Sequence, residues 1–386
     1  MTRTTCATVL MLLAPSVLVS QNLEQPDDRW QGVERVLAQA VREHAFPGAV
    51  LVVGLGGKIV YSRGTGHFGD NDPTPVTDST IYDLASLTKV VGLTTAVMLL
   101  VAHDSIDLDA PVSRYLPEFH GPAKDKVSVR HLLTHTSGLP AWRPFYQETS
   151  NAPDARDSII ATPLEHNPGD VFKYSDIGAI ILGMVVERIT HMTLDRYLDR
   201  AVFVPLQMAQ TRFRPPAGLR RRIAPTEADP WRGHVLRGEV HDENAARLGG
   251  VAGHAGLFST GPDLAKFAFW LLDSYHGRHP TTSNPHLPAE IVREFVARQP
   301  GPKGSTRALG WDTPSKTGSS AGSLMPRSSF GHTGFTGTSM WIDPDRELFI
   351  ILLTNRVHPT RENNQIRQIR PLVADAVLKA LAERNH

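Results

Sequence analysis

The sequence contains one cysteine, and its position limits the chemistry that the chain can perform. Cys6 lies among the first 20 of 386 residues, where a basic start, an apolar stretch and small residues near Ser20 are typical of a secretory signal peptide. Without residues 1–20 the chain has no thiol, which excludes disulfides, a thiolate nucleophile and cysteine metal ligands. We therefore expect an exported, periplasmic or extracellular protein that depends on its hydrophobic core for stability.

The sequence also lacks an excess of charge and long hydrophobic runs. Lys and Arg number 40 against 39 Asp and Glu, a formal charge of +1, so nothing draws the chain to nucleic acid or to an anionic membrane. Beyond the leader, no segment has the roughly 18 unbroken apolar residues of a membrane span. We expect no integral span in the mature chain. The sequence leaves open the oligomeric state and whether the leader is removed.

Two β-rich hairpins lie near the two ends of the chain, one around GLGG at 54–57 and one around DPDRE at 343–347. This arrangement predicts an α+β fold, with an antiparallel sheet formed by N- and C-terminal strands, flanked by helices, and a mainly helical central region at about 104–300. We expect one domain over 28–386. Apolar periodicity predicts helices at 29–45, 84–103, 176–190, 263–273 (capped by Asp263) and 365–382.

Ser86 and Lys89 lie three residues apart in DLASLTK, at the start of a predicted helix. Side chains at this spacing share one helix face, so the amine is within reach of the hydroxyl. Serine is a weak nucleophile and needs such a base, and a lysine in an apolar environment loses its proton more easily than a free one. A helix start also directs backbone N–H groups toward developing negative charge. Because Ser-x-x-Lys occurs often by chance, other motifs must support this interpretation.

Two further motifs follow along the chain. KYSDIGAIILG places Tyr174 two residues before Asp176, and FGHTGFTGTSMWID places His332, Thr333 and Gly334 at the start of a predicted strand. In this order the segments resemble the Ser-x-x-Lys, Tyr-x-Asn and Lys-Thr-Gly motifs of the penicillin-recognising serine hydrolases. That family includes the serine β-lactamases, the low-molecular-weight penicillin-binding proteins and related esterases, and the class C β-lactamase branch is the most similar.

The resemblance extends over about residues 35–382 and implies a β-lactamase/transpeptidase-like fold with no metal and no cofactor. It implies that Ser86 forms an acyl-enzyme and that Lys89 and Tyr174 move the proton. The N–H groups of Ser86 and Phe335 would stabilise the oxyanion. The positions expected to bind substrate are Asp176, His332, Thr333, Gly334 and Phe335.

Two positions depart from the family motifs. Asp176 stands where the family commonly has Asn, and an ionised carboxylate cannot donate a hydrogen bond to a substrate carbonyl. It could instead hold Lys89 in its charged form. His332 replaces the usual Lys, and histidine is largely neutral above a pKa of about 6.5, so it attracts a substrate carboxylate weakly and in a pH-dependent way. The change at His332 argues against an efficient β-lactamase.

Two competing patterns are present. Lys316–Gly318 spell Lys-Thr-Gly literally, but the surrounding Ser- and Gly-rich sequence predicts a loop, whereas the motif needs a strand beside the cleft. His241, Asp242, Glu243 and His254 are the best candidate for a metal cluster. They match no known ligand spacing, so a structural loop beside the active site is favoured.

The resemblance leaves several substrates open. The expected export and the similarity of residues 240–260 to a subgroup of penicillin-binding proteins favour a DD-carboxypeptidase or another peptidase of peptidoglycan peptides. The changes at Asp176 and His332 favour an esterase or amidase of small acyl substrates, and a β-lactamase comes third. An alternative of another class is a non-catalytic β-lactam-binding sensor, which intact Lys89 and Tyr174 make less favoured.

Overall fold

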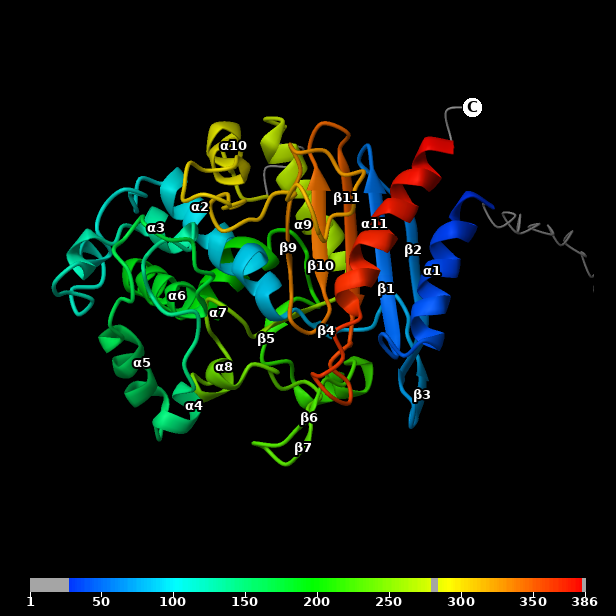
Figure 1. Cartoon of the computed structure of the whole chain (residues 1–386), viewed down its shortest axis with the longest axis horizontal. Coiled ribbons are helices and arrows are strands. Elements are labelled where there is room, and N and C mark those ends of the chain that lie inside the picture. Colours follow the sequence, from blue (N-terminus) through cyan, green and yellow to red (C-terminus); the bar gives the residue numbers. More distant parts are fainter. Residues whose placement is uncertain (1–27, 279–283, 384–386) are drawn as a thin grey trace, which may run out of the picture.

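The computed structural model describes residues 28–278 and 284–383, so the predicted signal peptide lies outside the described residues. An antiparallel sheet in the order β3-β2-β1-β11-β10-β9 joins the two ends of the chain, as Figure 1 shows. This confirms the α+β prediction and both hairpins. Its strands are β1 Gly48–Leu55, β2 Lys58–Gly69, β3 Asp72–Pro75, β9 Phe330–Thr333, β10 Ser339–Asp343 and β11 Leu348–Thr354.

Helices cover both faces of this sheet, which is why β1 and β11 are almost continuously apolar. Along β1, Leu51 and Val53 pack into the core shared with α1 (Gln31–Arg42) and α11 (Ile366–Ala382). The alternate residues Val50 and Val52 pack into a larger core with α9 (Gly261–Tyr275). The sheet therefore separates two hydrophobic cores.

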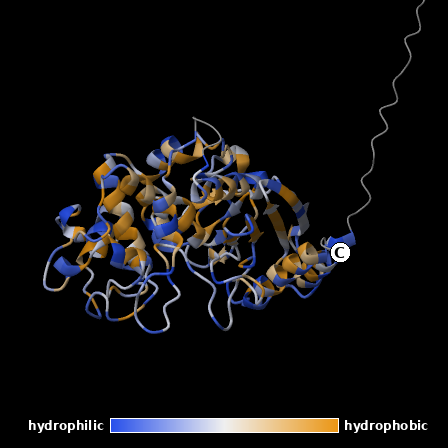
Figure 2. Cartoon of the chain, turned by 90° about the horizontal axis from the view of Figure 1, so that it is seen from above, coloured by the Kyte–Doolittle hydropathy of each residue, from blue (hydrophilic) through white to orange (hydrophobic). Residues whose placement is uncertain are grey.

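The larger core continues into a mainly helical region beside the sheet, on the left of Figure 1. Figure 2 shows apolar residues gathered inside this region and hydrophilic residues on its outer loops. Its helices are α2 Thr95–Ala102, α3 Val129–Leu133, α4 Phe145–Glu148, α5 Ala152–Ala161, α6 Asp176–Thr190, α7 Leu194–Leu198, α8 Glu243–Arg247 and α10 Ala289–Val296. Small strands join them, namely β4 Tyr82–Asp83, β5 Arg212–Phe213, β8 Leu257–Ser259, and the β6–β7 hairpin of Ala228–Asp229 and His234–Val235. The limits of a single domain over 28–386 stay a prediction.

One helical stretch of the described chain, Ala85–Ala102, is long and apolar enough to cross a membrane, but 83% of it is buried inside the protein. It is the central core segment and carries Ser86 and Lys89. The predicted helix at 84–103 is also less regular than expected. A 3-10 turn over 85–87 is followed by a π-helical stretch over 89–94 before α2 begins.

Two sequence-based details were wrong. His332 and Thr333 lie at the end of strand β9, and Gly334 follows it, because a turn closed by the Gly334 N–H and the Thr338 carbonyl separates β9 from β10. The cap of α9 is Thr260, whose side chain accepts from the Asp263 N–H. The Asp263 carboxylate instead accepts from the N–H of Gln210, at 2.7 Å.

Candidate active site

Ser86, Lys89 and Asp176 meet in the interior beside the large sheet. The Lys89 Nζ donates to the Ser86 Oγ at 2.9 Å and to the His254 carbonyl at 3.1 Å. It also lies 2.7 Å from the Asp176 Oδ1. The spacing of three residues therefore brings the amine onto the hydroxyl, although a 3-10 turn rather than an α-helix does so. Asp176 reaches the same point as the first residue of α6, after its cap Ser175.

Lys89 is held in its charged form. Burial alone would lower its pKa, but the Asp176 carboxylate and the Tyr174 hydroxyl outweigh burial and raise the pKa above its ordinary value. This agrees with the suggestion that Asp176 holds Lys89 in its charged form, and it disagrees with the suggestion that apolar packing frees Lys89 of its proton. A charged ammonium donates to Ser86 and cannot accept its proton, so another group must be the base.

Tyr174 is the remaining candidate for that base, and its ring is packed between neighbours. The Lys89 Nζ lies 5.0 Å from the ring centroid. The His135 and His332 rings lie 4.5 and 5.9 Å away. His135 also accepts from the Ser175 N–H through Nδ1, at 3.1 Å, so it fixes the backbone next to the phenol.

The backbone of Ser86 and Phe335 provides two free N–H groups. Among the described residues, no group accepts a hydrogen bond from either one. The residues after β9 can approach Ser86 closely because Gly334 has no side chain. A Cβ at this position would lie 2.4 Å from the Leu84 carbonyl oxygen. Thr338 reinforces this contact by donating to the same carbonyl at 2.9 Å. Both residues line the same cavity, so the pair is the candidate oxyanion hole of this site.

His332 is neutral in this site. Burial, assisted by the nearby Arg307 and Lys89 charges, holds its pKa well below the ordinary value. Its Nδ1 donates to the Thr333 carbonyl at 2.8 Å, while its Nε2 is buried with no partner in the described chain. The charge expected at this motif position must therefore come from elsewhere.

Arginines supply that charge. A cavity of about 330 Å³ is lined by Ser86, Tyr174 and the 332–335 segment together with Arg307, Arg356, Arg367 and Arg370. The Nε and Nη1 of Arg307 and the Nε of Arg370 are buried with no partner among the described residues. The sequence analysis missed these residues because they come from a loop and a helix that carry no motif. Only the fold brings them to Ser86.

Two of these arginines also hold the turn that carries the Phe335 N–H. The Arg370 Nη2 donates to the Gly334 and Thr338 carbonyls at 2.6 and 2.8 Å. The Arg356 Nε donates to the Phe335 carbonyl at 2.8 Å, and its guanidinium lies 4.4 Å from the Phe335 ring. Burial lowers the pKa of Arg370 to about 9. The turn is therefore supported by buried cations on its carbonyl side.

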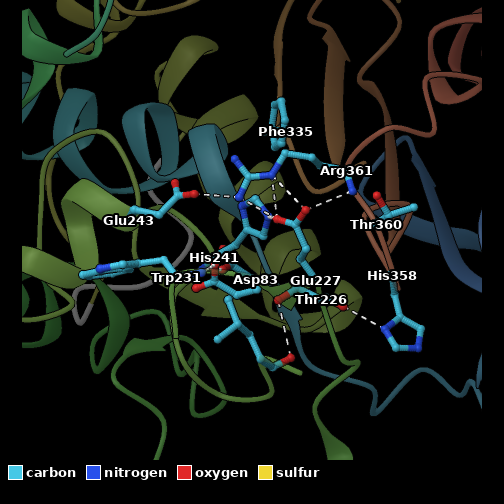
Figure 3. Close-up of polar contacts among 12 residues, drawn as sticks. Asp83, Thr226, Glu227, Trp231, His241, Glu243, Phe335, His358, Thr360 and Arg361 are labelled. Atoms are coloured by element: carbon cyan, nitrogen blue, oxygen red, sulfur yellow. Dashed lines mark hydrogen bonds and ion pairs between the residues drawn. The ribbon is translucent and has the colours of Figure 1, made fainter. Parts of the chain in front are cut away.

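A buried polar network lies behind the Phe335 ring, as Figure 3 shows. The His241 ring lies 5.6 Å from the Phe335 ring, and its Nε2 bonds to Glu227 at 2.9 Å. Arg361 pairs with Glu227 and, at 2.6 Å, with Glu243. Burial would raise the pKa of Glu227, but hydrogen bonds with His241 and Arg361 lower it to about 2.

The same network reaches the backbone next to Ser86. Asp83 accepts from the His241 N–H at 2.7 Å and from the Ala85 N–H at 2.8 Å, directly before Ser86. His254 instead pairs with Asp242 at 2.7 Å. The four residues of the competing metal pattern thus support the active site as parts of separate polar pairs. Across residues 28–278 and 284–383, no group of three His, Cys, Asp or Glu is placed to hold a metal.

The literal Lys-Thr-Gly segment is placed differently. Lys316–Gly318 lie in a loop, outside any strand, and do not line the cavity beside Ser86. Strand β9 does carry His332 and Thr333 to that cavity. The structure thus brings together Ser86, Lys89, Tyr174 and Asp176 with the 332–335 segment. The catalytic and binding roles of these residues remain predictions.

Comparison with known proteins accounts for this arrangement. The sequence model of the Beta-lactamase family matches residues 33–374. The chain belongs to the β-lactamase family. Within that family it is a serine hydrolase that acts by acyl transfer, in keeping with the contact between Lys89 and the Ser86 hydroxyl.

Relatives of this β-lactamase-family chain have different names. The N-acetylmuramyl-L-alanine amidase of Bacillus subtilis is 32% identical over 90% of this chain and 85% of its own length. A Salmonella typhi protein with the provisional name D-alanyl-D-alanine carboxypeptidase is 34% identical over 76% of this chain and 73% of its own. A class C β-lactamase structure covers 90% of this chain and 96% of its own with a TM-score of 0.72, but at 20% identity it supports the fold alone.

Proposed function

We propose that this chain is an exported, penicillin-binding-protein-like DD-carboxypeptidase that removes the terminal residue of cell-wall peptides through an acyl-enzyme at Ser86. The observation that carries the proposal is the group of arginines, Arg307, Arg356, Arg367 and Arg370, that lines the cavity beside Ser86. In such a peptide the leaving residue carries a carboxylate close to the scissile bond. Guanidinium groups bind carboxylates strongly and with defined geometry.

Acylation needs a base that is not Lys89. Tyr174, whose ring lies beside the Lys89 amine, accepts the Ser86 proton while the oxygen attacks the carbonyl. The N–H groups of Ser86 and Phe335 stabilise the oxyanion, and one such donor is typically worth about 100- to 1,000-fold in rate. Tyr174 then passes the proton to the departing amine, which leaves as the C–N bond breaks. In deacylation Tyr174 activates a water molecule, and the proton returns to Ser86.

A second candidate is an amidase that cleaves the bond between N-acetylmuramic acid and the first alanine of the wall peptide. The similarity to the Bacillus subtilis amidase over 90% of this chain favours it. The acyl-enzyme chemistry at Ser86 would be the same. The two candidates differ only in which amide bond lies between the oxyanion hole and the arginines.

Labelling and turnover test the proposal together. Purified wild type should be labelled by a fluorophosphonate and should release D-alanine from a D-Ala-D-Ala peptide. Ser86→Ala should lose both, while Ser137→Ala, which changes another buried serine, should retain both. Full labelling of Ser86→Ala would reject the nucleophile. Turnover of an N-acetylmuramoyl-L-alanine peptide alone would support the amidase, and stable β-lactam labelling without turnover of either peptide would support a sensor.

A further inference from the structure

Exposed aromatic side chains gather near the catalytic residues. In the described parts of the chain, Trp142, Trp231 and Phe335 are 44%, 39% and 50% exposed. A tryptophan left in water forfeits a large gain from burial. Phe335 borders the oxyanion hole, and the residue before Trp142, Ala141, accepts from the Asp176 N–H at 2.9 Å. Exposure of large aromatic groups at such a place indicates a binding surface.

Two of these rings form one continuous surface with a third. The Tyr146 ring lies 6.3 Å from Trp142 and 4.8 Å from Trp231, which it meets edge to face. We call Trp142, Tyr146 and Trp231 the aromatic platform. Trp231 lies between strands β6 and β7, and in Figure 3 its indole points away from the Glu227–His241 network. The platform therefore joins two segments that are far apart in the sequence.

Hydrogen bonds hold the aromatic platform in place. Asn244 accepts from the Tyr146 N–H at 3.1 Å and donates to the Arg143 carbonyl at 2.8 Å. Arg247 donates to the Tyr146 carbonyl at 2.7 Å, and its guanidinium lies 5.6 Å from the Trp231 ring. Both residues belong to α8, which begins after Asp242, the partner of His254. The His254 carbonyl in turn accepts from Lys89, so the surface is tied to the catalytic lysine.

Polar groups border the exposed rings. Arg143 and Glu148 form an ion pair at 2.6 Å, and Gln147 donates to the Tyr146 hydroxyl at 2.8 Å. A purely aliphatic ligand would pack on the rings but would form no hydrogen bonds with these polar groups. The pyranose ring of an amino sugar can contact both the rings and the polar groups. Its C–H face packs on an aromatic ring, while its hydroxyl and amide groups project outward to polar partners.

We propose that the aromatic platform binds the pyranose ring of an N-acetylated amino sugar carried by the acyl part of the substrate. Tyr146 of the platform lies on α4 and Trp231 lies in the β6–β7 hairpin. Of the cationic groups beside Ser86, Arg307 comes from a loop and Arg370 from α11. The sugar and the carboxylate of the leaving group would thus contact different walls of the site. This inference rests on the proposed acyl transfer at Ser86 and favours its amidase form, in which the scissile amide joins the sugar's lactoyl group to the first alanine.

Binding to the full chain with Ser86→Ala tests this without turnover. Two probes share one amide bond, N-acetylmuramoyl-L-alanine and its sugar-free counterpart, N-lactoyl-L-alanine. Calorimetry should give a dissociation constant about tenfold lower for the sugar-bearing probe, the gain typical of an added aromatic contact. Trp142→Ala and Trp231→Ala should remove that difference. Val235→Ala, which changes an exposed side chain on the same hairpin, should preserve it.

A second variant separates recognition from folding. Trp231→Phe retains an aromatic face and should keep at least half of the preference for the sugar-bearing probe, even if Trp231→Ala disturbs the hairpin. Equal binding of the two probes to the Ser86→Ala chain would overturn the inference. An equal loss of affinity for both probes in Trp142→Ala and in Trp231→Phe would overturn it as well.

The outcome for the proposed function is separate. A clear sugar preference in Ser86→Ala, with no turnover of any amide by wild type, would preserve the aromatic platform and reject acyl transfer. Release of D-alanine by wild type, with equal binding of the two probes, would preserve the proposed function and reject the platform.

Discussion

The Lys89 ammonium lies 2.7 Å from the Asp176 carboxylate, and the lysine side chain is only 3% exposed. Two opposing effects act on this amine, because burial disfavours its charge and the carboxylate favours it. The carboxylate prevails. Asp176, which stands where the family commonly has Asn, therefore raises the pKa of Lys89, and this makes Asp176 the sharpest place to test the mechanism.

Asp176→Asn should lower the pKa of Lys89, because the variant loses the negative charge that counteracts the effect of burial. If loss of the Lys89 proton ends activity at high pH, the alkaline limb of the kcat/KM profile should move to lower pH. The profile should be measured for wild type and for Asp176→Asn on the same substrate. Asp170→Asn, which changes an exposed carboxylate, is the control. An alkaline limb that stays in place in Asp176→Asn would contradict a charged Lys89 as the stabiliser of Tyr174.

Gly334→Ala should reduce kcat about 100-fold or more, because the added Cβ would lie 2.1 Å from the Thr338 Oγ1 and 2.4 Å from the Leu84 carbonyl oxygen. Relief of these contacts must move the Phe335 N–H away from the oxyanion, and losing one such donor costs about 100- to 1,000-fold. Gly301→Ala, where the added atom meets nothing closer than 3.7 Å, should retain wild-type kcat. Equal activity of the two variants would remove the 334–335 segment from the oxyanion hole.

Glu227→Gln should lower kcat more than it changes KM. The buried carboxylate holds His241 and Arg361, and His241 supports the Phe335 ring and, through Asp83, the backbone before Ser86. Removing one partner from a buried ion pair typically costs about 3 to 5 kcal/mol of stability, so the melting temperature should also fall. Kinetics must therefore be measured well below that temperature. Glu239→Gln, which changes the partner of His234 in an exposed pair, should change neither kcat nor the melting temperature. A raised KM with unchanged kcat in Glu227→Gln would instead assign Glu227 to substrate binding.

The unfolding free energy should fall as the pH decreases below about 6.5. Burial, together with the charges of Arg307 and Lys89, holds the pKa values of His135 and His332 well below the ordinary value. Between the folded and unfolded pKa values the unfolded chain binds more protons, so acid favours unfolding. Urea unfolding of wild type and of His332→Asn at pH 5 to 8 measures this effect. The variant should show a shallower loss at low pH, and parallel curves would show that His332 is not neutral in the folded chain.

The motifs led to the candidate catalytic centre because the relevant spacing is short. Ser86 and Lys89 meet at 2.9 Å since they are three residues apart on one turn, and the same geometry holds for most helical starts. The sequence order of Tyr174 and His332 then matched one family. Hairpins and buried strands were predicted correctly for a similar reason, because alternation and turn residues act over a few neighbours.

The charge state of the site depended on contacts between distant segments. The sequence suggested both an apolar environment for Lys89 and a role for Asp176 in keeping it charged. Which effect prevails depended on the 2.7 Å approach of Asp176, and this required packing of α6 against the central helical segment. Arg307 and Arg370 line the cavity although no motif marks them. The π-helical stretch over 89–94 was not predicted. The cap of α9 was assigned to Asp263, whose carboxylate instead accepts from the N–H of the distant residue Gln210, while Thr260 caps the helix locally.

The amino-acid sequence by itself determined the family, the α+β architecture and the order of the nucleophile, amine and phenol, because these depend on local periodicity and short motifs. Only the tertiary structure decided which groups are charged, which N–H donors are free and which aromatic rings stay exposed. Protonation, hydrogen bonding and exposure depend on every neighbour within a few ångströms, and folding brings those neighbours from all parts of the chain.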